Sequence, residues 1–336
     1  MRRSCEPSAC FARAVPPERR PARMNLRELD DRELVRRLRT SAQADRALVD
    51  EYYRRCIPLY QGFLGEHWHT GYYGESQPSA ADQVRMIEVV AGSIGLGPAD
   101  RVLDVGCGIG GTVCHLAQHA GAQVTGLTPV AEQRTLAEAL IRKRGLSERA
   151  EIVTGEAARL PFPDASFDAV VFFESPCHFP DRLRFFREVG RVLRPGGRLA
   201  GEDWLVAPDV SAADRDLYIQ PIEQGWAIPA LGDGATYVQA MHEAQFCDIQ
   251  WQDLAAVIPL GKGFATQRAQ QIALVQDIRK CREPLLQFVL EGLLHLGRAA
   301  GAGAFTIGQF SARKPTRQAP LSGSATAWCR STPAHD

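Results

Sequence analysis

The sequence predicts an α/β fold in which a parallel sheet carries helices on both faces, the doubly wound arrangement. Two observations support this prediction. Between residues 101 and 204, segments with strand composition alternate with segments of helical apolar spacing, and such alternation is typical of a parallel sheet. A glycine-rich turn at 106–111 directly follows the first expected strand and precedes a helix. A strand, a glycine turn and a helix in this order favour a small-molecule site at the helix N-terminus.

The expected elements follow from apolar periodicity along the chain. Before the alternating region, helices are expected at 26–38, 47–64 and 80–94. The alternating region is expected to hold strands at 102–105, 123–128, 151–153, 169–173 and 198–204, with helices at 112–120, 130–143 and 182–193. Beyond it, we expect helices at 211–226, 236–245, 267–281 and 284–297, and strands at 248–257 and 304–312.

The two ends differ from this pattern. Residues 1–23 are rich in arginine and proline and lack apolar periodicity. We therefore expect a disordered or non-native start, with translation from Met24 as the alternative interpretation. Residues 316–336 are rich in Ser, Thr, Ala and Pro and are expected to form a disordered tail. The part between them divides into N-terminal helices at 24–98 and a main domain at 99–315.

The composition limits the classes of function. Lys plus Arg and Asp plus Glu each number 39, so the chain lacks the basic excess that is typical of nucleic-acid binding. It also has no stretch approaching the roughly 20 apolar residues that a membrane span needs. Nine cysteines without paired spacing favour reduced thiols in a cytoplasmic protein. We expect a small-molecule substrate, no nucleic-acid partner and no membrane span, and the oligomeric state is left open.

The glycine turn first suggests a dinucleotide site. Gly106, Gly108 and Gly111 have the spacing of the dinucleotide fingerprint. That fingerprint also needs an acidic residue at the end of the second strand, where it holds a ribose hydroxyl. Here the second strand ends at Thr128, and the acidic residue that is present, Asp104, precedes the turn. Because a carboxylate beside a pyrophosphate would repel it, this context argues against NAD and for a cationic cofactor.

The run at 104–110, Asp-Val-Gly-Cys-Gly-Ile-Gly, resembles the first motif of class I S-adenosylmethionine-dependent methyltransferases. Three further stretches resemble the same family in its order. They are an adenine-contacting loop at 154–162, the fourth strand at 166–170 and the turn into the fifth strand at 192–197. The resemblance implies a Rossmann-like, mostly parallel sheet with an antiparallel last strand. It also implies an N-terminal helical lid and a helical insertion after the fifth strand, at about 206–300, that covers the substrate.

The resemblance implies S-adenosyl-L-methionine as the cofactor, bound at the carboxyl ends of the strands. Glycine lets a ligand approach the backbone, and aromatic faces can stabilise a sulfonium. Thr128 stands where many family members have an acidic residue, and Gln133 could bond the ribose hydroxyls instead. The expected cofactor residues are Tyr72, Tyr73, Asp104, Gly106, Gly108, Gly110, Thr128, Gln133, Glu156, Ala157 and Phe173.

Three local stretches resemble one subgroup of the family. They are a cofactor-closing segment at 64–73, a loop after the fourth strand at 174–181 and the final strand at 305–315. The subgroup includes rebeccamycin-type sugar O-methyltransferases, tocopherol C-methyltransferases and geranyl diphosphate C-methyltransferases. The resemblance therefore implies an enzyme that methylates a small molecule.

Two residues are candidates for catalysis. His178 lies in the loop after the fourth strand, where histidine suits proton abstraction near neutral pH, and Asp203 matches an aspartate that follows the fifth strand in the sugar O-methyltransferases. We expect methylation of a hydroxyl on a hydrophobic natural-product intermediate, with His178 as general base. Aromatic residues in the loop, the insertion and nearby strands suggest an apolar cover, namely Phe179, Trp204, Trp226 and Trp251.

Two alternatives remain open. The first is C-methylation of an isoprenoid or an aromatic ring. The second, of a different class, is a methyltransferase-like protein that binds the cofactor without catalysis. A metal site is not expected, because His67 and His69 form a pair without a third ligand at a recognisable spacing and zinc needs three or four protein ligands.

Overall fold

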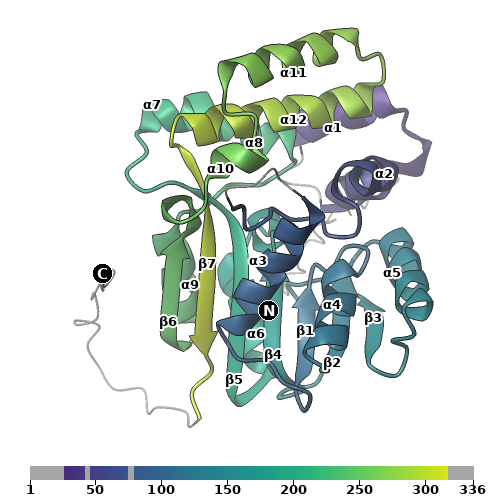
Figure 1. Cartoon of the computed structure of the whole chain (residues 1–336), viewed down its shortest axis with the longest axis vertical. Coiled ribbons are helices and arrows are strands. Elements are labelled where there is room, and N and C mark those ends of the chain that lie inside the picture. The colour runs from purple at the N-terminus through teal and green to yellow at the C-terminus, as the bar shows by residue number, and fades with distance from the viewer. Residues whose placement is uncertain (1–25, 42–45, 75–78, 317–336) are drawn as a thin grey trace, which may run out of the picture.

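The computed structural model describes residues 26–41, 46–74 and 79–316. The expectations for residues 1–23 and for the tail at 317–336 concern segments outside these ranges. Figure 1 shows a central sheet with helices on both faces and a further layer of helices above one end of the strands. No helix in the described ranges is long and apolar enough to cross a membrane.

Seven strands form one mixed sheet. They are β1 (Arg101–Val105), β2 (Gln123–Thr128), β3 (Ala150–Thr154), β4 (Phe167–Phe173), β5 (Leu193–Val206), β6 (Cys247–Asp253) and β7 (Phe305–Arg313). Their order across the sheet is β3-β2-β1-β4-β5-β7-β6. The pairs from β3 to β5 are parallel, whereas β7 runs antiparallel to both β5 and β6. The predicted doubly wound sheet with an antiparallel last strand is confirmed.

The helices occupy both faces and the upper layer. Before β1 lie η1 (Leu26–Glu28), α1 (Asp31–Ser41), α2 (Arg46–Leu64) and α3 (Ala80–Gly92). Between the parallel strands lie α4 (Gly111–His119), α5 (Ala131–Lys143), η2 (Pro176–His178) and α6 (Arg182–Val192). The segment between β5 and β6 holds α7 (Ala212–Asp214), η3 (Arg215–Ile219), α8 (Gln220–Gly225) and α9 (Gly234–Glu243). Between β6 and β7 lie η4 (Leu254–Ala256), α10 (Leu260–Gly263), α11 (Arg268–Lys280) and α12 (Pro284–Gly301). The expected helical insertion after the fifth strand is thus present.

The side chains of β5 point alternately to the two faces of the sheet. They therefore contribute to two separate cores, one on each face. Leu199 and Leu205 pack in the core that contains α6 and α9. Ala200 and Trp204 pack in the core that contains α2, α3, α4 and α12. The second core continues from the sheet into the upper helical layer. It therefore positions the helices that cover the carboxyl ends of the strands.

Several expected elements have different bounds in the structure. The fifth strand, for example, begins at Leu193 rather than 198, and three of the differences have a local cause. The first helix begins at Asp31 rather than 26, because the Asp30 carboxylate accepts a hydrogen bond from the Glu33 amide at 2.8 Å and caps the helix there. The helix expected at 211–226 is interrupted by the π-helical segment η3, next to Pro221, which has no amide hydrogen for a regular helix. The strand expected to reach 257 ends at Asp253, whose carboxylate caps η4.

We predict that Gly201→Ala destabilises the fold by about 1–3 kcal/mol. A Cβ atom at Gly201 would lie 2.4–2.5 Å from ring atoms of Phe172, and Phe172 is fully buried between the sheet and α6. Urea unfolding measures the free energy. The control is Gly62→Ala in α2, where a Cβ meets nothing within 4 Å and alanine favours the helix. Equal stability of the two variants would contradict the prediction.

Candidate functional site

A cavity of about 480 Å³ lies at the carboxyl ends of the parallel strands. Its floor is built from the ends of β1, β2 and β4 and the loops that follow them, together with Trp204 of β5. Its cover comes from α2, the segment 65–74, α10 and α12. Ligands bind at this end of open α/β sheets, and the volume lies within the range of small-molecule pockets.

The structure gathers most of the sequence-predicted site residues in this cavity. Nine of them line it, namely Tyr73, Gly106, Gly108, Thr128, Gln133, Glu156, Ala157, Phe173 and His178. The other four, which are Tyr72, Asp104, Gly110 and Asp203, are not part of the described cavity wall. The Tyr72 ring lies instead beneath the Arg85 guanidinium, whose carbon is 5.5 Å from the ring centroid.

The glycine turn after β1 presents its backbone to the cavity. Gly106 and Gly108 have φ angles of 87° and 52°, which favour glycine. A Cβ at Gly106 would lie 2.4 Å from the Cβ of Ser175, so the turn packs directly on the loop after β4. Gly110 caps α4 with a φ of 85° and packs on Ala137. Its role in the structure is to begin the helix behind the turn.

Asp104 lies behind the same turn. Its carboxyl group is 2% exposed, and Oδ2 has no hydrogen-bond partner among the described residues. Burial raises its pKa to about 7, because removal from water disfavours the charged form. Asp104 is therefore a dry carboxyl group adjoining the turn rather than a group in the cavity wall.

The end of β2 provides a neutral polar pair. The Thr128 hydroxyl donates a hydrogen bond to the Gln133 side-chain oxygen at 2.6 Å, and both residues are buried in the cavity wall. This contact leaves the Gln133 amide hydrogens available to a ligand. Glu156 and Ala157 line the adjoining part of the cavity. This end combines the glycine backbone of the turn, the polar pair of Thr128 and Gln133, and apolar walls. These groups fit S-adenosylmethionine.

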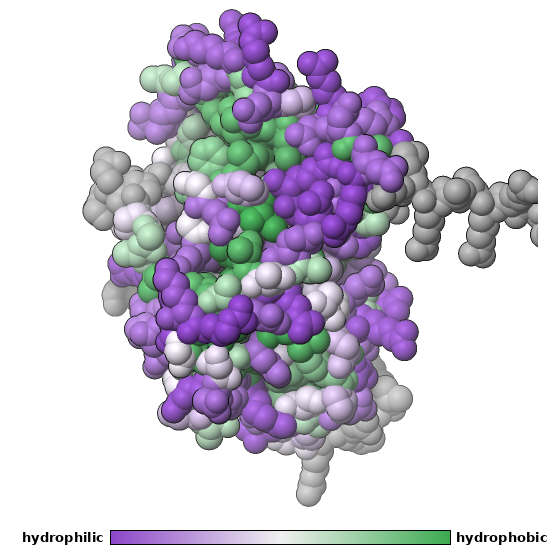
Figure 2. All heavy atoms as spheres, turned by 90° about the vertical axis from the view of Figure 1, so that its right-hand side faces the viewer, coloured by the Kyte–Doolittle hydropathy of each residue, from purple (hydrophilic) through white to green (hydrophobic). Residues whose placement is uncertain are grey.

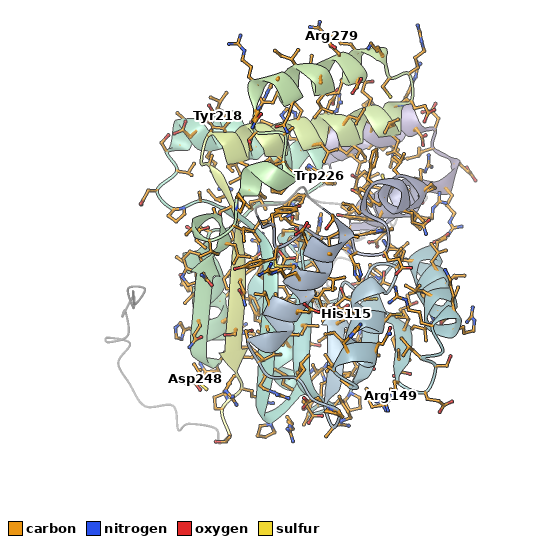
Figure 3. The ribbon with its side chains drawn as sticks, in the orientation of Figure 1. His115, Arg149, Tyr218, Trp226, Asp248 and Arg279 are labelled. Atoms are coloured by element: carbon orange, nitrogen blue, oxygen red, sulfur yellow. The ribbon has the colours of Figure 1, made fainter. Side chains whose placement is uncertain are left out.

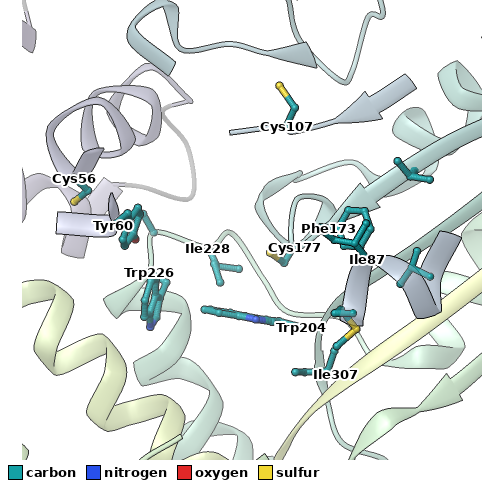
Figure 4. Close-up of a cluster of buried hydrophobic side chains, with 14 of the residues drawn as sticks. Cys56, Tyr60, Ile87, Cys107, Phe173, Cys177, Trp204, Trp226, Ile228 and Ile307 are labelled. Atoms are coloured by element: carbon teal, nitrogen blue, oxygen red, sulfur yellow. The ribbon is translucent and has the colours of Figure 1, made fainter. Parts of the chain in front are cut away.

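The other end of the cavity is aromatic. Tyr60 and Trp68 meet edge to face with centroids 5.2 Å apart, and Tyr60 stacks on Trp226 at 6.3 Å. Trp226 and Trp204 meet edge to face at 5.1 Å. Figure 4 shows Tyr60, Trp226 and Trp204 in sequence around this end. Trp251, which was expected in the cover, lies instead on β6, where it stacks on Phe310 and is 37% exposed.

An apolar surface adjoins this end. Phe63, at the end of α2, lines the cavity and is 56% exposed. The face at the right of Figure 1 shows apolar atoms between hydrophilic ones in its upper half (Figure 2). Phe63 therefore provides an exposed apolar side chain beside the cavity.

Glu174 is a site residue that sequence reasoning missed. It follows β4, lines the cavity and has a φ of 47°, a strained conformation for a residue with a side chain. Its carboxylate accepts a hydrogen bond from the Thr70 amide at 2.8 Å. Burial raises its pKa to about 7, although hydrogen bonds from Thr70 and Trp204 act in the opposite direction. An acidic residue directly after an apolar strand was the available signal.

His178 lines the cavity, and its Nε2 atom lies 2.6 Å from the Tyr53 hydroxyl. Burial lowers its pKa to about 3, and the positive charges of Arg46 and Arg182 add to this effect. The imidazole is therefore neutral at physiological pH. Tyr53 was missed because it lies on α2, 125 residues away in sequence.

Asp203 lies behind the cavity on the opposite face of β5 from Trp204. It is fully buried, and its Oδ2 atom accepts a hydrogen bond from the Tyr237 hydroxyl at 2.7 Å. Burial raises its pKa to about 6. The structure thus does not bring Asp203 to the same cavity wall as His178.

His67 and His69 are both buried in the segment that covers the cavity, and burial lowers the pKa of each. Their rings lie 5.9 Å apart between centroids. Across residues 26–41, 46–74 and 79–316, no group of three or more His, Cys, Asp or Glu side chains could hold a metal ion.

We predict that Asp104→Asn gains stability relative to the unchanged protein as the pH rises. The usual aspartate pKa is 3.8, and burial raises that of Asp104 to about 7. The carboxyl group therefore favours the folded state below its ordinary pKa, and this contribution is lost as the pH rises towards 7. Asparagine cannot ionise, so the difference in free energy of unfolding should move by about 1.4 kcal/mol per pH unit in favour of the variant.

Urea unfolding between about pH 4 and about pH 7 measures this difference. Asp216→Asn, at an exposed position, is the control and should not diverge from the unchanged protein. A difference for Asp104→Asn that stays constant over this range would contradict the assigned pKa.

Comparisons with known proteins agree with this geometry. Residues 103–201 match the model of a methyltransferase domain family. The chain is 35% identical over 224 residues to 24-methylenesterol C-methyltransferase 2 of Oryza sativa subsp. japonica, covering 64% of this chain and 61% of that protein. It is 32% identical over 215 residues to cycloartenol-C-24-methyltransferase of Arabidopsis thaliana, covering 63% of this chain and 64% of that protein. The chain thus spans about three fifths of the length of such curated relatives.

The fold is shared with solved structures. One is geranyl diphosphate C-methyltransferase from Streptomyces coelicolor A3(2), in complex with Mg²⁺, geranyl diphosphate and S-adenosyl-L-homocysteine. The TM-score is 0.60 at 19% identity, with 82% of this chain and 98% of that chain covered. The strand order, the glycine turn and the matched family model agree: residues 103–201 carry a methyltransferase domain, and the chain is similar to class I S-adenosylmethionine-dependent methyltransferases.

Proposed function

We propose that this protein transfers a methyl group from S-adenosylmethionine to an apolar small molecule. One observation carries the proposal: a single cavity joins the glycine turn at one end to the aromatic wall at the other. Gly106, Gly108, Thr128 and Gln133 would hold the cofactor, and the aromatic end would hold the acceptor. When bound, S-adenosylmethionine supplies an electrophilic methyl group on a sulfonium sulfur.

The aromatic end favours a carbon acceptor. An alkene that takes up a methyl group as an electrophile forms a carbon–carbon bond with its π electrons and leaves a carbocation on the adjacent carbon. The faces of Trp204, Trp226 and Tyr60 stabilise such a positive charge. The carboxylate of Glu174, which lines the same cavity, can accept the proton whose loss forms a new double bond. Relatives named as sterol C-methyltransferases support this acceptor class.

A hydroxyl acceptor is the second candidate, and the observation that favours it is the position of His178 in the cavity wall. The imidazole is neutral and holds a lone pair on Nε2 towards Tyr53. The imidazole would accept the proton through Tyr53, whose hydroxyl passes its hydrogen to Nε2 and takes the proton of the substrate hydroxyl as that oxygen becomes methylated. The reaction would then form an ether and would not need Glu174 as proton acceptor.

Mass spectrometry with isotopically labelled S-adenosylmethionine tests the proposal. The acceptors are cycloartenol and 24-methylenesterol, which the names of relatives suggest. We expect one labelled methyl group on a carbon atom of the product, which fragmentation and NMR locate. A methyl ether would favour the second candidate. Tight binding of S-adenosylhomocysteine without turnover of any acceptor in a broad metabolite extract would instead support a non-catalytic cofactor-binding protein.

We predict that Glu174→Gln lowers the turnover number of carbon methylation about 10²–10³-fold, because the amide cannot accept the proton. The affinity for S-adenosylhomocysteine, measured by calorimetry, should change little. Because the pKa of Glu174 is raised to about 7, the rate of the unchanged enzyme should rise from about pH 6 to about pH 8 as the carboxyl group ionises.

The matched control is Glu138→Gln on the exposed side of α5, where Glu138 pairs only with Arg134 in the described contacts. It should keep both the rate and its pH dependence. An unchanged rate for Glu174→Gln would remove this residue from the mechanism.

A further inference from the structure

Three polar tips of the aromatic wall, those of Tyr60, Trp68 and Trp226, are turned towards protein groups. The Trp204 indole is instead directed at Glu174 in the cavity wall. The Tyr60 hydroxyl is hydrogen bonded to the buried Tyr52 hydroxyl at 2.7 Å. The Trp68 indole donates to the Gly65 carbonyl at 3.1 Å. The Trp226 Nε1 atom faces α12. It lies 2.6 Å from the position that a Cβ atom would take if Gly292 had a side chain. Figure 3 shows Trp226 between the helical layer and the sheet.

Tyr53 differs from these residues. It lines the cavity, and its hydroxyl forms a 2.6 Å hydrogen bond with His178 Nε2. The two rings meet edge to face at 90° with centroids 5.2 Å apart. The phenolic oxygen therefore lies between two residues that line the cavity, and the imidazole holds it in place.

The two nitrogens of His178 are both closed to a ligand. Nε2 is occupied by Tyr53. Nδ1 is enclosed by protein and faces the backbone of Ala227. Of this pair, the phenolic oxygen of Tyr53 is therefore the polar atom with hydrogen-bonding capacity left for a ligand.

The protonation states of Tyr53 and His178 determine which hydrogen bond the phenol can still form with a ligand. Burial raises the pKa of Tyr53 well above its usual value and lowers that of His178, so both groups are neutral at physiological pH. A backbone hydrogen bond to Ala227 acts to raise the pKa of His178, so Nδ1 carries the imidazole hydrogen and Nε2 accepts the Tyr53 O–H, which uses the phenolic proton. The phenolic oxygen keeps its acceptor capacity and requires a donor from the ligand.

We propose that Tyr53, rather than His178, contacts the substrate, and that its phenolic oxygen accepts a hydrogen bond from a hydroxyl group on an otherwise apolar molecule. Tyr53 is thus a specificity-determining residue, and His178 is the residue that positions it. The inference rests on the proposed function of the cavity. It names the substrate class as an apolar alcohol, whichever atom receives the methyl group.

The experiment compares cycloartenol with its analogue that lacks the hydroxyl group. We expect the unchanged enzyme to prefer cycloartenol about tenfold in kcat/KM, as one hydrogen bond supplies. In Tyr53→Phe this preference should disappear while the affinity for S-adenosylhomocysteine stays unchanged. If Tyr53 has a purely structural role, Tyr53→Phe should lower kcat/KM for both acceptors alike, and this result would overturn the inference. A preference for cycloartenol that survives in Tyr53→Phe would also overturn it.

Variants of His178 test the positioning role. His178→Ala should weaken the preference for the alcohol, and His178→Gln, whose amide oxygen can accept from Tyr53, should restore it in part. The double variant Tyr53→Phe/His178→Ala should be no worse than Tyr53→Phe alone. A larger loss in His178→Ala than in Tyr53→Phe would show that His178 itself contacts the substrate. The control is His115→Ala, a buried histidine on α4 outside the described cavity wall (Figure 3).

The outcomes separate the inference from the proposed function. If the unchanged protein fails to bind S-adenosylhomocysteine, the proposed function is contradicted. If it binds this compound but methylates both acceptors equally, the hydroxyl is not recognised and the inference alone is overturned. If it binds this compound but methylates no acceptor in a broad metabolite extract, the proposed function is contradicted.

Discussion

The close packing of the glycine turn on the loop after β4 is the constraint on which the site depends. Ser175 occupies the space that a side chain at Gly106 would need, and its hydroxyl donates to the Val105 carbonyl at 2.6 Å. This contact joins the carboxyl ends of β1 and β4. It places Glu174, which precedes Ser175, in the same cavity as the turn that would hold the cofactor. A larger residue at 106 would separate the two halves of the site.

Exclusion of water is the second general property of this region. Asp104, Glu174 and Asp203 are carboxyl groups near the strand ends, and burial raises the pKa of each. Glu202 is fully buried, both of its oxygens lack a hydrogen-bond partner among the described residues, and its pKa is raised for the same reason. Of these four groups only Glu174 lines the cavity, and the low dielectric around its carboxylate strengthens the interaction of that group with a positive charge. This environment suits a reaction in which the positive charge moves from the sulfonium of the cofactor to a cation of the substrate.

Much of the fold was predictable because its signals are local. Alternating strands and helices between 101 and 204 follow from apolar periodicity, and the turn at Gly106 and Gly108 follows from glycine spacing. The interruption by η3 and the early end of β6 were missed because they depend on Pro221 and on a cap at Asp253. Most of the residues predicted to bind the cofactor also line the cavity, since the sequence places them at strand ends. Asp203 shows the limit, because one position along a strand decides which face a side chain occupies.

The sequence by itself determined the sheet, the glycine turn and the class of cofactor, since each depends on residues that are close together in the chain. Only the tertiary structure decided which residues meet at the aromatic end of the cavity. The pairing of Tyr53 with His178 spans 125 residues, and the contact of Thr70 with Glu174 spans 104. Such contacts arise from the packing of α2 and the covering segment against the sheet, and no local pattern encodes them. The same packing turns the hydroxyl of Tyr60 away from the cavity and leaves that of Tyr53 at its wall.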